Sequence, residues 1–240
     1  MINKNEVKYI QSLYHKKNGE EEGLFIAEGP KLVGEILTSD FEIKNIFATA
    51  QWADSHKTVA NCVEVSQQEL EKISNLQTPN QVVALVQQKK PDREPVLENM
   101  LTLMLDGLQD PGNMGTILRI ADWFGITQII ASGDTVNMYN PKVIQASMGS
   151  FLRVSVYYTR LKEILKRSFV PVYGALLNGK SIYDMDKIQE GILVIGNESR
   201  GIRDNIMPFI FHPVTIPRRG KAESLNAAVA TGIILSHIAP

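Results

Sequence analysis

The chain has 240 residues, of which 44% are hydrophobic and 21% charged, a composition typical of a globular protein and not of a disordered or membrane-embedded one. Its net charge of -1 argues against a protein that coats nucleic acid non-specifically, because that mode of binding needs a broad excess of Lys and Arg. The length allows one large or two modest domains, and the arginines favour two, since all nine lie at or after Arg93.

Neither the first residues nor the cysteine and histidine usage points to a membrane, a disulfide or a metal. The opening segment MINKNEVKYI contains no apolar run that could act as a signal peptide or a membrane span. Cys62 is the only cysteine, and the four histidines are far apart without metal-ligand spacing. We therefore expect a cytoplasmic protein with no membrane association and no bound metal.

The first 90 residues predict a small α/β domain. Helical patterns at about 4–15, 29–38 and 66–74 alternate with the β-rich runs LFIAEG, KNIFAT and QVVALVQQ. The charged stretch 87–95 carries Pro91 and Pro95 and lacks apolar periodicity, so we place a linker at 91–97 and a second domain at 98–240.

Strands and helices alternate in the second domain. Six apolar runs are expected to be strands: 101–105, 127–132, 152–158, 170–177, 191–196 and 211–217. Helices are expected at 113–124, 141–149, 160–168, 201–207 and 224–238, the second of them capped by Asn140 and opened by Pro141. This alternation predicts a parallel sheet with helices on both faces.

Three segments of this domain predict one site: DPGNMGTILR at 110–119, VIGNESRG at 194–201 and TIPRRGKAESLNAAVA at 215–230. In each, an apolar run ends in a loop rich in Gly, Pro or Asn, and a helix is expected to follow. Open α/β sheets place their ligand-binding loops at strand ends in this way. We expect the three loops to meet.

Each segment also has a purely structural interpretation. Asn113 is expected to cap the first helix, and Arg119, lying among apolar residues, could serve a structural ion pair with Glu198 or Asp122 as readily as a function. Glu198 could complement the dipole of a following helix. The small residues of 227–232 could simply allow close helix packing.

The order of the three motifs changes this balance. The patterns Asn-x-Gly-x-x-x-Arg, Gly-x-Glu-x-x-Gly, and Ile-Pro followed by Ser-Leu-Asn resemble the three motifs of the SpoU/TrmH family of RNA ribose 2'-O-methyltransferases. The resemblance runs from about residue 100 to the C-terminus and includes NPKVIQASMGSFLRVSV, which is similar to the family's region between motifs one and two. The preceding domain, with FIAEGPKLVGEIL, resembles the small α/β substrate-binding domain of rRNA-directed members, itself similar to a ribosomal RNA-binding protein.

The resemblance implies a deep trefoil knot of the SPOUT type, in which the C-terminal helix threads a loop and forms a pocket for S-adenosylmethionine. It also implies a homodimer formed through the knotted domain, with both subunits completing each active site. By position, the cofactor contacts fall on Gly196, Asn197, Ile216, Pro217 and Leu225. The catalytic set implied by the motifs is Asn113, Arg119, Glu198, Ser224 and Asn226.

The family assigns activation of the ribose 2'-hydroxyl to the arginine of motif one, here Arg119. A guanidinium has a pKa above about 12 and is a poor general base, so we expect Arg119 to hold a phosphate or the hydroxyl and to stabilise developing negative charge. Arg218, Arg219 and Lys221 are candidate RNA contacts. Lys16 and Lys17 are also candidates, although solvated surface is the favoured interpretation for both lysines.

Ribosomal RNA is expected as the substrate rather than tRNA, by analogy with members that carry the extra domain. A tRNA 2'-O-methyltransferase and a catalytically inactive RNA-binding protein of the same fold are the alternatives. A Rossmann-type methyltransferase or dehydrogenase is discounted, because neither DPGNMG nor GNESRG has the G-x-G-x-x-G spacing of that fold.

Overall fold

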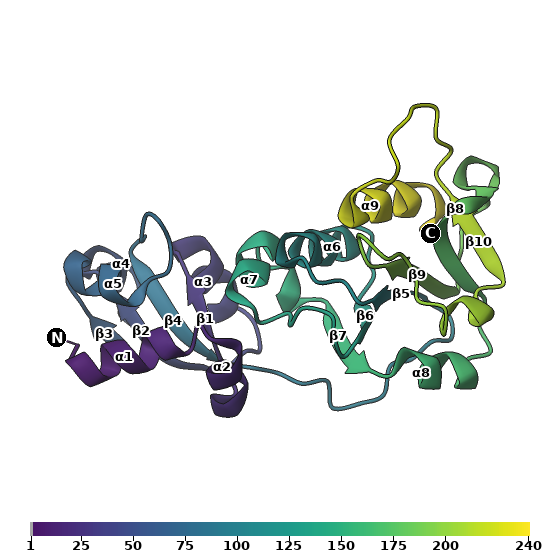
Figure 1. Ribbon diagram of the computed structural model, residues 1–240. Helices are drawn as coiled ribbons and strands as arrows, with labels where there is room; N and C mark the ends of the chain where they lie inside the picture. Colours follow the sequence, from purple (N-terminus) through teal and green to yellow (C-terminus); the bar gives the residue numbers. More distant parts are fainter. Residues whose placement is uncertain (1) are drawn as a thin grey trace. The chain divides into compact units, whose positions relative to one another are not determined.

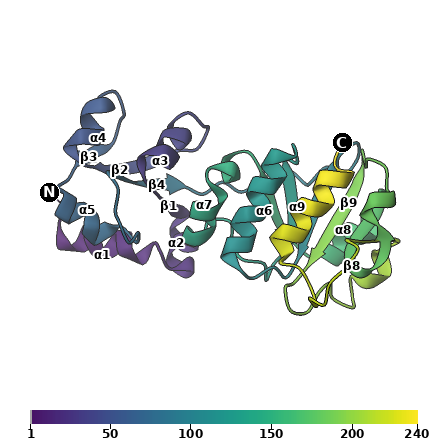
Figure 2. The same cartoon turned by 90° about the horizontal axis from the view of Figure 1, so that it is seen from above.

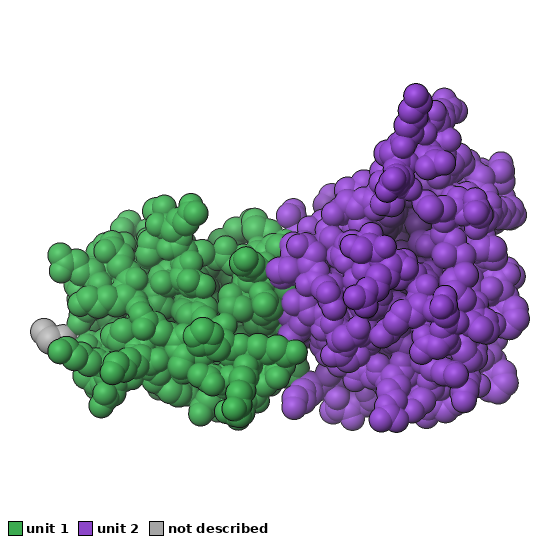
Figure 3. Space-filling view, in the orientation of Figure 1, with its two compact units in different colours: residues 1–89, 139–152 green, residues 90–138, 153–240 purple. Residues whose placement is uncertain are grey.

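The chain folds into two compact units, coloured separately in Figure 3. The computed structural model describes residues 2–240, and no helix in that range is long and apolar enough to cross a bilayer. The first unit contains the described residues up to Lys89 together with 139–152, and the second contains 90–138 and 153–240.

The first unit is built on a mixed sheet in the order β1-β4-β2-β3. Its strands are β1 (Leu24–Glu28), β2 (Ile43–Ala48), β3 (Cys62–Glu64) and β4 (Val82–Gln87). Strand β4 pairs antiparallel with β1 and β2, whereas β2 and β3 are parallel. The helices around it are α1 (Lys4–Ser12), α2 (Lys16–Glu22), α3 (Pro30–Leu37), α4 (Ala50–Ser55) and α5 (Gln67–Ile73).

Most of these elements follow the sequence prediction, with three differences. The helix expected over 4–15 is two helices, because the chain turns after α1 and His15 is extended at the start of α2. The short elements α4 and β3 were not predicted. Each has six residues or fewer, too short for hydrophobic periodicity to show.

The segment 139–152, which carries α7 (Pro141–Ser147), completes an aromatic cluster of the first unit. The Tyr139 ring stacks on Phe25 with centroids 4.8 Å apart, and the Phe151 ring meets Phe25 edge-on at 5.5 Å and Phe41 at 5.8 Å. The Tyr139 hydroxyl donates to the Lys89 carbonyl at 2.7 Å and accepts from the Lys89 amide at 2.9 Å. The core of this unit therefore depends on residues distant in sequence.

The second unit contains an all-parallel six-stranded sheet in the order β10-β8-β9-β5-β6-β7, which confirms the predicted parallel sheet. Its strands are β5 (Leu101–Asp106), β6 (Gln128–Ser132), β7 (Ser155–Thr159), β8 (Val172–Ser181), β9 (Gly191–Gly196) and β10 (His212–Thr215). The register of β5 with β9 runs from Leu101 opposite Gly191 to Asp106 opposite Gly196, so these two central strands end together.

Helices cover both faces of this sheet, as Figures 1 and 2 show. Helix α8 (Leu161–Arg167) packs on one face, against a cluster that includes Met104, Ile192 and Val194. The alternate strand residues point to the other face, where α6 (Pro111–Trp123) and α9 (Ala227–Ile238) pack against each other.

Two predictions about helix positions are wrong. No helix follows the second motif: Gly201 has a φ of +69°, and the chain then makes only the short 3-10 turn η3 (Met207–Phe209). Asn113 is not an N-cap, because α6 begins at Pro111 and the Asp110 carboxylate accepts the Asn113 amide at 2.7 Å. Proline fits the first helical position, which shifts the cap to the residue before it. The Asn113 side chain is thereby available for other contacts.

Replacing Phe151 by Ala should lower the free energy of unfolding by about 3 to 5 kcal/mol, because the ring is 2% exposed and its loss leaves a cavity between Phe25 and Phe41. Urea denaturation measures this. The matched control is Phe169→Ala, whose ring is 99% exposed and whose loss should change stability by no more than about 0.5 kcal/mol. Equal effects of the two substitutions would show that 139–152 does not belong to the core.

Candidate functional site

The strand order places a crevice at the carboxyl ends of β5 and β9. From β5 the chain proceeds to β6 on one side, whereas from β9 it proceeds towards β10 on the other, so the topological switch point lies between them. A pocket of about 580 Å³ lies there, lined by Gln109, Asp110, Asn113, Asn197, Glu198, Ser199, Arg200 and Asn226. All three sequence motifs contribute to this lining.

A chain of side-chain hydrogen bonds joins the three motifs through Asn113. The Asn113 amide nitrogen donates to Glu198 Oε1 at 2.9 Å, and its carbonyl oxygen accepts from the Asn226 amide nitrogen at 2.7 Å. These partners are 85 and 113 residues away in sequence. Asn113 is 8% exposed, whereas Glu198 is half-buried and Asn226 is exposed, so both bonds are partly buried.

The chemistry of the two ends fixes the orientation of these amides. Asn226 caps α9, and its oxygen accepts the backbone N-H groups of Ala228 and Val229 at 3.0 and 3.2 Å. Its NH₂ group must therefore face Asn113. At the other end the Glu198 carboxylate can only accept, so Asn113 must turn its own NH₂ towards it. Every member of the chain is satisfied in one arrangement only.

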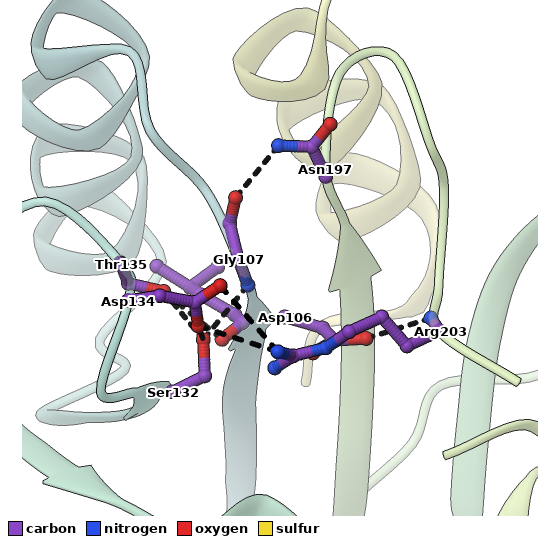
Figure 4. A network of polar contacts seen from close by, with 8 residues as sticks. Asp106, Gly107, Ser132, Asp134, Thr135, Asn197 and Arg203 are labelled. Atoms are coloured by element: carbon purple, nitrogen blue, oxygen red, sulfur yellow. Dashed lines mark hydrogen bonds and ion pairs between the residues drawn. The ribbon is translucent and has the colours of Figure 1, made fainter. Parts of the chain in front are cut away.

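The second motif forms a tight turn held to the first motif. Asn197 bridges to Gly201 across the turn, and its side-chain oxygen accepts the backbone N-H groups of Ser199 and Arg200. Its amide nitrogen donates to the Gly107 carbonyl at 2.7 Å (Figure 4). A Cβ on Gly196 would lie 2.3 Å from the carbonyl carbon of Gly201, so this position requires glycine.

Beneath the turn lies a polar network that sequence reasoning missed (Figure 4). Asp106, the last residue of β5, is fully buried and accepts from Arg203 Nε at 2.6 Å and from the Arg203 backbone amide at 2.8 Å. The guanidinium also meets Asp134 at 3.4 Å, and Asp134 in turn accepts from Ser132 at 2.7 Å. The network ties the ends of β5 and β6 to the chain that follows β9.

The opposite charges of this network shift the pKa values of its members. Hydrogen bonds to Asp106 raise the pKa of Arg203, and the neighbouring Asp134 adds to the effect. The hydrogen bond from Ser132, followed by the Arg203 charge, lowers the pKa of Asp134. The one signal in the sequence was Asp106 itself, a carboxylate ending the apolar run LTLML, since a buried charge needs a partner.

Arg119 does not form a structural ion pair with Glu198 or Asp122. Asp122 instead binds Arg153, with Nη2 2.8 Å from Oδ2, and Glu198 binds Asn113. The Arg119 side chain is exposed on the outer face of α6 and forms no hydrogen bond or ion pair with any residue in the range 2–240. It lies outside the lining of the pocket.

Most of the third motif also lies away from the pocket lining. Ile216 is half-buried, and Pro217, Ser224 and Leu225 are exposed on the segment between β10 and α9, which projects from the unit in Figure 1. On this segment the guanidinium of Arg218 donates to the Ala222 carbonyl at 3.1 Å, and Arg219 and Lys221 are exposed. The structure thus gathers Asn113, Asn197, Glu198 and Asn226, with Gly196 at the strand end.

The candidate lysines of the first unit lie on α2 in surface ion pairs. Lys16 and Lys17 each stand 3.9 Å from the glutamate one turn ahead, Glu20 and Glu21. Such pairs are weak and leave the side chains free to exchange partners. Their contact with RNA stays a prediction. Within residues 2–240, no group of three or more His, Cys, Asp or Glu side chains could hold a metal ion.

Comparison with known proteins agrees with this geometry. Residues 100–236 match the SpoU rRNA Methylase family, and residues 4–84 match the MRM3-like substrate binding domain. The chain belongs to the SpoU rRNA methylase family. It is 30% identical over 239 residues to the 23S rRNA (guanosine(2553)-2'-O)-methyltransferase RlmP of Bacillus subtilis, covering 97% of this chain and 95% of that protein.

Solved structures of other members share the whole architecture. A putative RNA methyltransferase of the TrmH family from Porphyromonas gingivalis is 38% identical with a TM-score of 0.88, covering 99% of this chain and 98% of that one. An AdoMet-bound rRNA methyltransferase from Sinorhizobium meliloti is 30% identical with a TM-score of 0.87, covering 99% and 95%. The hydrogen-bonded site therefore lies in a fold seen with AdoMet, that is S-adenosylmethionine, in that relative.

Replacing Asn113 by Asp should destabilise the protein by about 1 to 3 kcal/mol at neutral pH, because a carboxylate replaces the donor that Glu198 needs. The loss should shrink as the pH falls below about 5, where the two facing carboxyls can share a proton. Thermal unfolding of the variant and the wild type across pH measures this. Asn178→Asp, the same change on an exposed part of β8, is the control and should show no such recovery. A pH-independent loss at Asn113 would contradict the assigned orientation.

Proposed function

We propose that this protein transfers a methyl group from S-adenosylmethionine to the 2'-hydroxyl of a ribose in ribosomal RNA. The observation that carries the proposal is the Glu198–Asn113–Asn226 chain, which closes the three family motifs around the pocket at the switch point. RlmP, the relative from Bacillus subtilis, is a 23S rRNA ribose 2'-O-methyltransferase by name. The match of 4–84 to a substrate binding domain supports a ribosomal substrate. The division of the sequence into 1–90, a linker at 91–97 and 98–240 stays a proposal, and 139–152 pack with the first unit.

The pocket fits a cofactor of this kind. Its volume of about 580 Å³ lies within the range of small-molecule sites, and it offers amides and two carboxylates, Asp110 and Glu198, near the ends of two central strands. Gly196 and Asn197 would hold the cofactor from the second motif. Ile216, Pro217 and Leu225 would hold it from the third, once the exposed segment between β10 and α9 closes on it.

The path of the C-terminal segment supports a deep trefoil knot in this domain. Strand β10 lies at one edge of the sheet, yet α9 returns to pack on α6, and Asn226 at its start bonds to Asn113 of the first motif. In the proposed topology the last segment threads the loops that form the cofactor pocket. A knot of this kind is one of the rare exceptions among protein folds.

The position of Arg119 supports a homodimer through the same domain. On α6, Gly112, Thr116, Arg119 and Trp123 recur at helical spacing along one exposed face, and the Trp123 side chain is 83% exposed. An exposed indole on α6 and the exposed Val229 on the neighbouring helix α9 favour burial against a second copy. In such a dimer Arg119 would complete the partner's site, since it lies outside the pocket of its own chain.

When bound, S-adenosylmethionine supplies an electrophilic methyl group on a sulfonium sulfur. The residues of the chain must then make the ribose 2'-hydroxyl nucleophilic. The guanidinium of Arg119 can hold that hydroxyl or an adjacent phosphate through its fork of donors and stabilise the negative charge that develops on oxygen. It stays protonated, so the proton leaves to the RNA phosphate or to water. Asn113, Glu198 and Asn226 position the loops. Ser224, in the third motif, can donate a hydrogen bond to the ribose oxygen that accepts the methyl group.

RNA contacts are proposed at Arg218, Arg219 and Lys221, beside the third motif, and at Lys16 and Lys17 of the first unit. The three residues beside the third motif are exposed on a projecting segment, where phosphate groups can reach them. A cytoplasmic location is part of the proposal, and a ribosomal RNA substrate supports it.

The activity is tested on ribosomal RNA from a strain that lacks the gene. Purified protein with methyl-labelled S-adenosylmethionine should label this RNA and protect one linkage from alkaline hydrolysis, because a methylated 2'-oxygen cannot attack its phosphate. RNA from the parent strain, already methylated, is the control and should accept little label. Labelling of tRNA alone would indicate a tRNA 2'-O-methyltransferase. Binding of RNA without any labelling would indicate a catalytically inactive RNA-binding protein.

Replacing Arg119 by Lys should reduce turnover by at least about a hundredfold, because an ammonium cannot reproduce the bidentate guanidinium. Cofactor affinity, measured by calorimetry, should stay within about twofold, since Arg119 lies outside the pocket lining. Arg167→Lys, a change at another exposed arginine of the same unit that lines neither pocket, should leave turnover unchanged. Near-normal turnover of the Arg119 variant would refute a role for the fork geometry.

A further inference from the structure

A second pocket lies at the carboxyl ends of β6 and β7, outside the three motifs. Its volume is about 440 Å³. Its walls come from the ends of these two strands, from α8 and from the chain after β9; they are Ser132, Gly133, Asp134, Thr159, Arg160, Leu161, Lys162, Glu163, Lys166, Arg203, Asn205 and Ile206. Ligands of open parallel sheets bind at this edge of the strands.

Four of the lining side chains are cationic and two are acidic. The acidic groups are already partnered: Glu163 lies 3.3 Å from Arg160, and Asp134 lies 3.4 Å from Arg203. Lys162 and Lys166 stand one turn apart on α8, both exposed, and form no hydrogen bond or ion pair with any residue between 2 and 240. Arg203 also binds Asp106, so two carboxylates face this one guanidinium. The positive charge that the pocket offers to a ligand therefore comes from Lys162 and Lys166.

The chain after β9 connects this pocket to the candidate active site. Residues Asn197 to Arg200 line the first pocket, whereas Arg203, Asn205 and Ile206 line the second. Between them, the bond of Arg203 to the buried Asp106 fixes the segment to the end of β5, as Figure 4 shows. Both pockets lie at the carboxyl edge of the same sheet, the first at β9 and β5 and the second at the adjacent β6 and β7. A nucleic-acid strand lying along this edge would meet both.

We propose that this second pocket binds phosphate groups of the RNA strand that flanks the target nucleotide, with Lys162 and Lys166 as the contacts. The proposal rests on the proposed function and extends it to the substrate path. A metal ion does not suit the pocket, because both of its carboxylates already bind arginines. Two exposed ammonium groups one helical turn apart suit a phosphate chain read without regard to base.

The test compares the double variant Lys162→Ala/Lys166→Ala with the wild type, using unmethylated large-subunit ribosomal RNA as the probe. RNA affinity should fall on the order of tenfold at low salt, and the slope of log affinity against log salt should flatten by about 1 to 2. Cofactor affinity and turnover at saturating RNA should match the wild type. Lys162→Arg/Lys166→Arg, which keeps the charge, should restore RNA affinity.

The matched control is Lys180→Ala/Lys187→Ala, which removes two exposed lysines from the same unit around a different hollow. Its RNA affinity should change at least threefold less than that of the α8 double variant. Equal losses in both double variants, or an unchanged salt slope in the α8 variant, would overturn the proposal. Saturable binding of ADP at Lys162 and Lys166, with RNA affinity unchanged in the α8 variant, would also overturn the proposal, because the pocket would then be a nucleotide site. Methylation of RNA by the wild type, measured in the same assay, tests the proposed function separately. Failure of this proposal is therefore distinguishable from failure of the proposed function.

Discussion

The site depends on one amide. Asn113 is the only group that bonds directly to both of the other motifs in the hydrogen-bond chain, and its two partners are 85 and 113 residues away. An amide suits this place because it offers a donor on one side and an acceptor on the other at a fixed separation. A carboxylate, which can only accept, or an ammonium, which can only donate, would leave one partner unsatisfied in this half-buried site.

The N-cap of α6 makes that arrangement possible. If Asn113 had capped the helix, as the sequence suggested, its side chain would have been turned towards the backbone of its own first turn. Asp110 takes this role instead, with Pro111 at the first helical position. This shift of the cap by three residues, from Asn113 to Asp110, releases the Asn113 side chain to join Glu198 and Asn226.

Sequence patterns predicted the strands of the parallel sheet because strands buried on both faces are continuous apolar runs, as LTLML and GILVIG show. The three loops were predicted to meet because the carboxyl ends of such strands share one edge. What the patterns could not predict are features set by tertiary context: the turn at Gly201 in place of a helix, the aromatic contacts of Tyr139 and Phe151 with Phe25, and the Asp106–Arg203 pair. In each case the deciding partner is remote in sequence.

Residues that hold the pocket and the residue assigned to activate the acceptor lie on different faces of the same helix. Asn113 faces inward at the start of α6, whereas Arg119 lies exposed, less than two turns further along. A guanidinium in the same pocket would meet the Glu198 carboxylate and compete with Asn113 for it. On the outer face, Arg119 leaves the Glu198–Asn113 bond undisturbed, and in the proposed dimer the anionic RNA would supply its partner. The proposed dimer would thus assemble the charged part of the site only where phosphate is present to balance it.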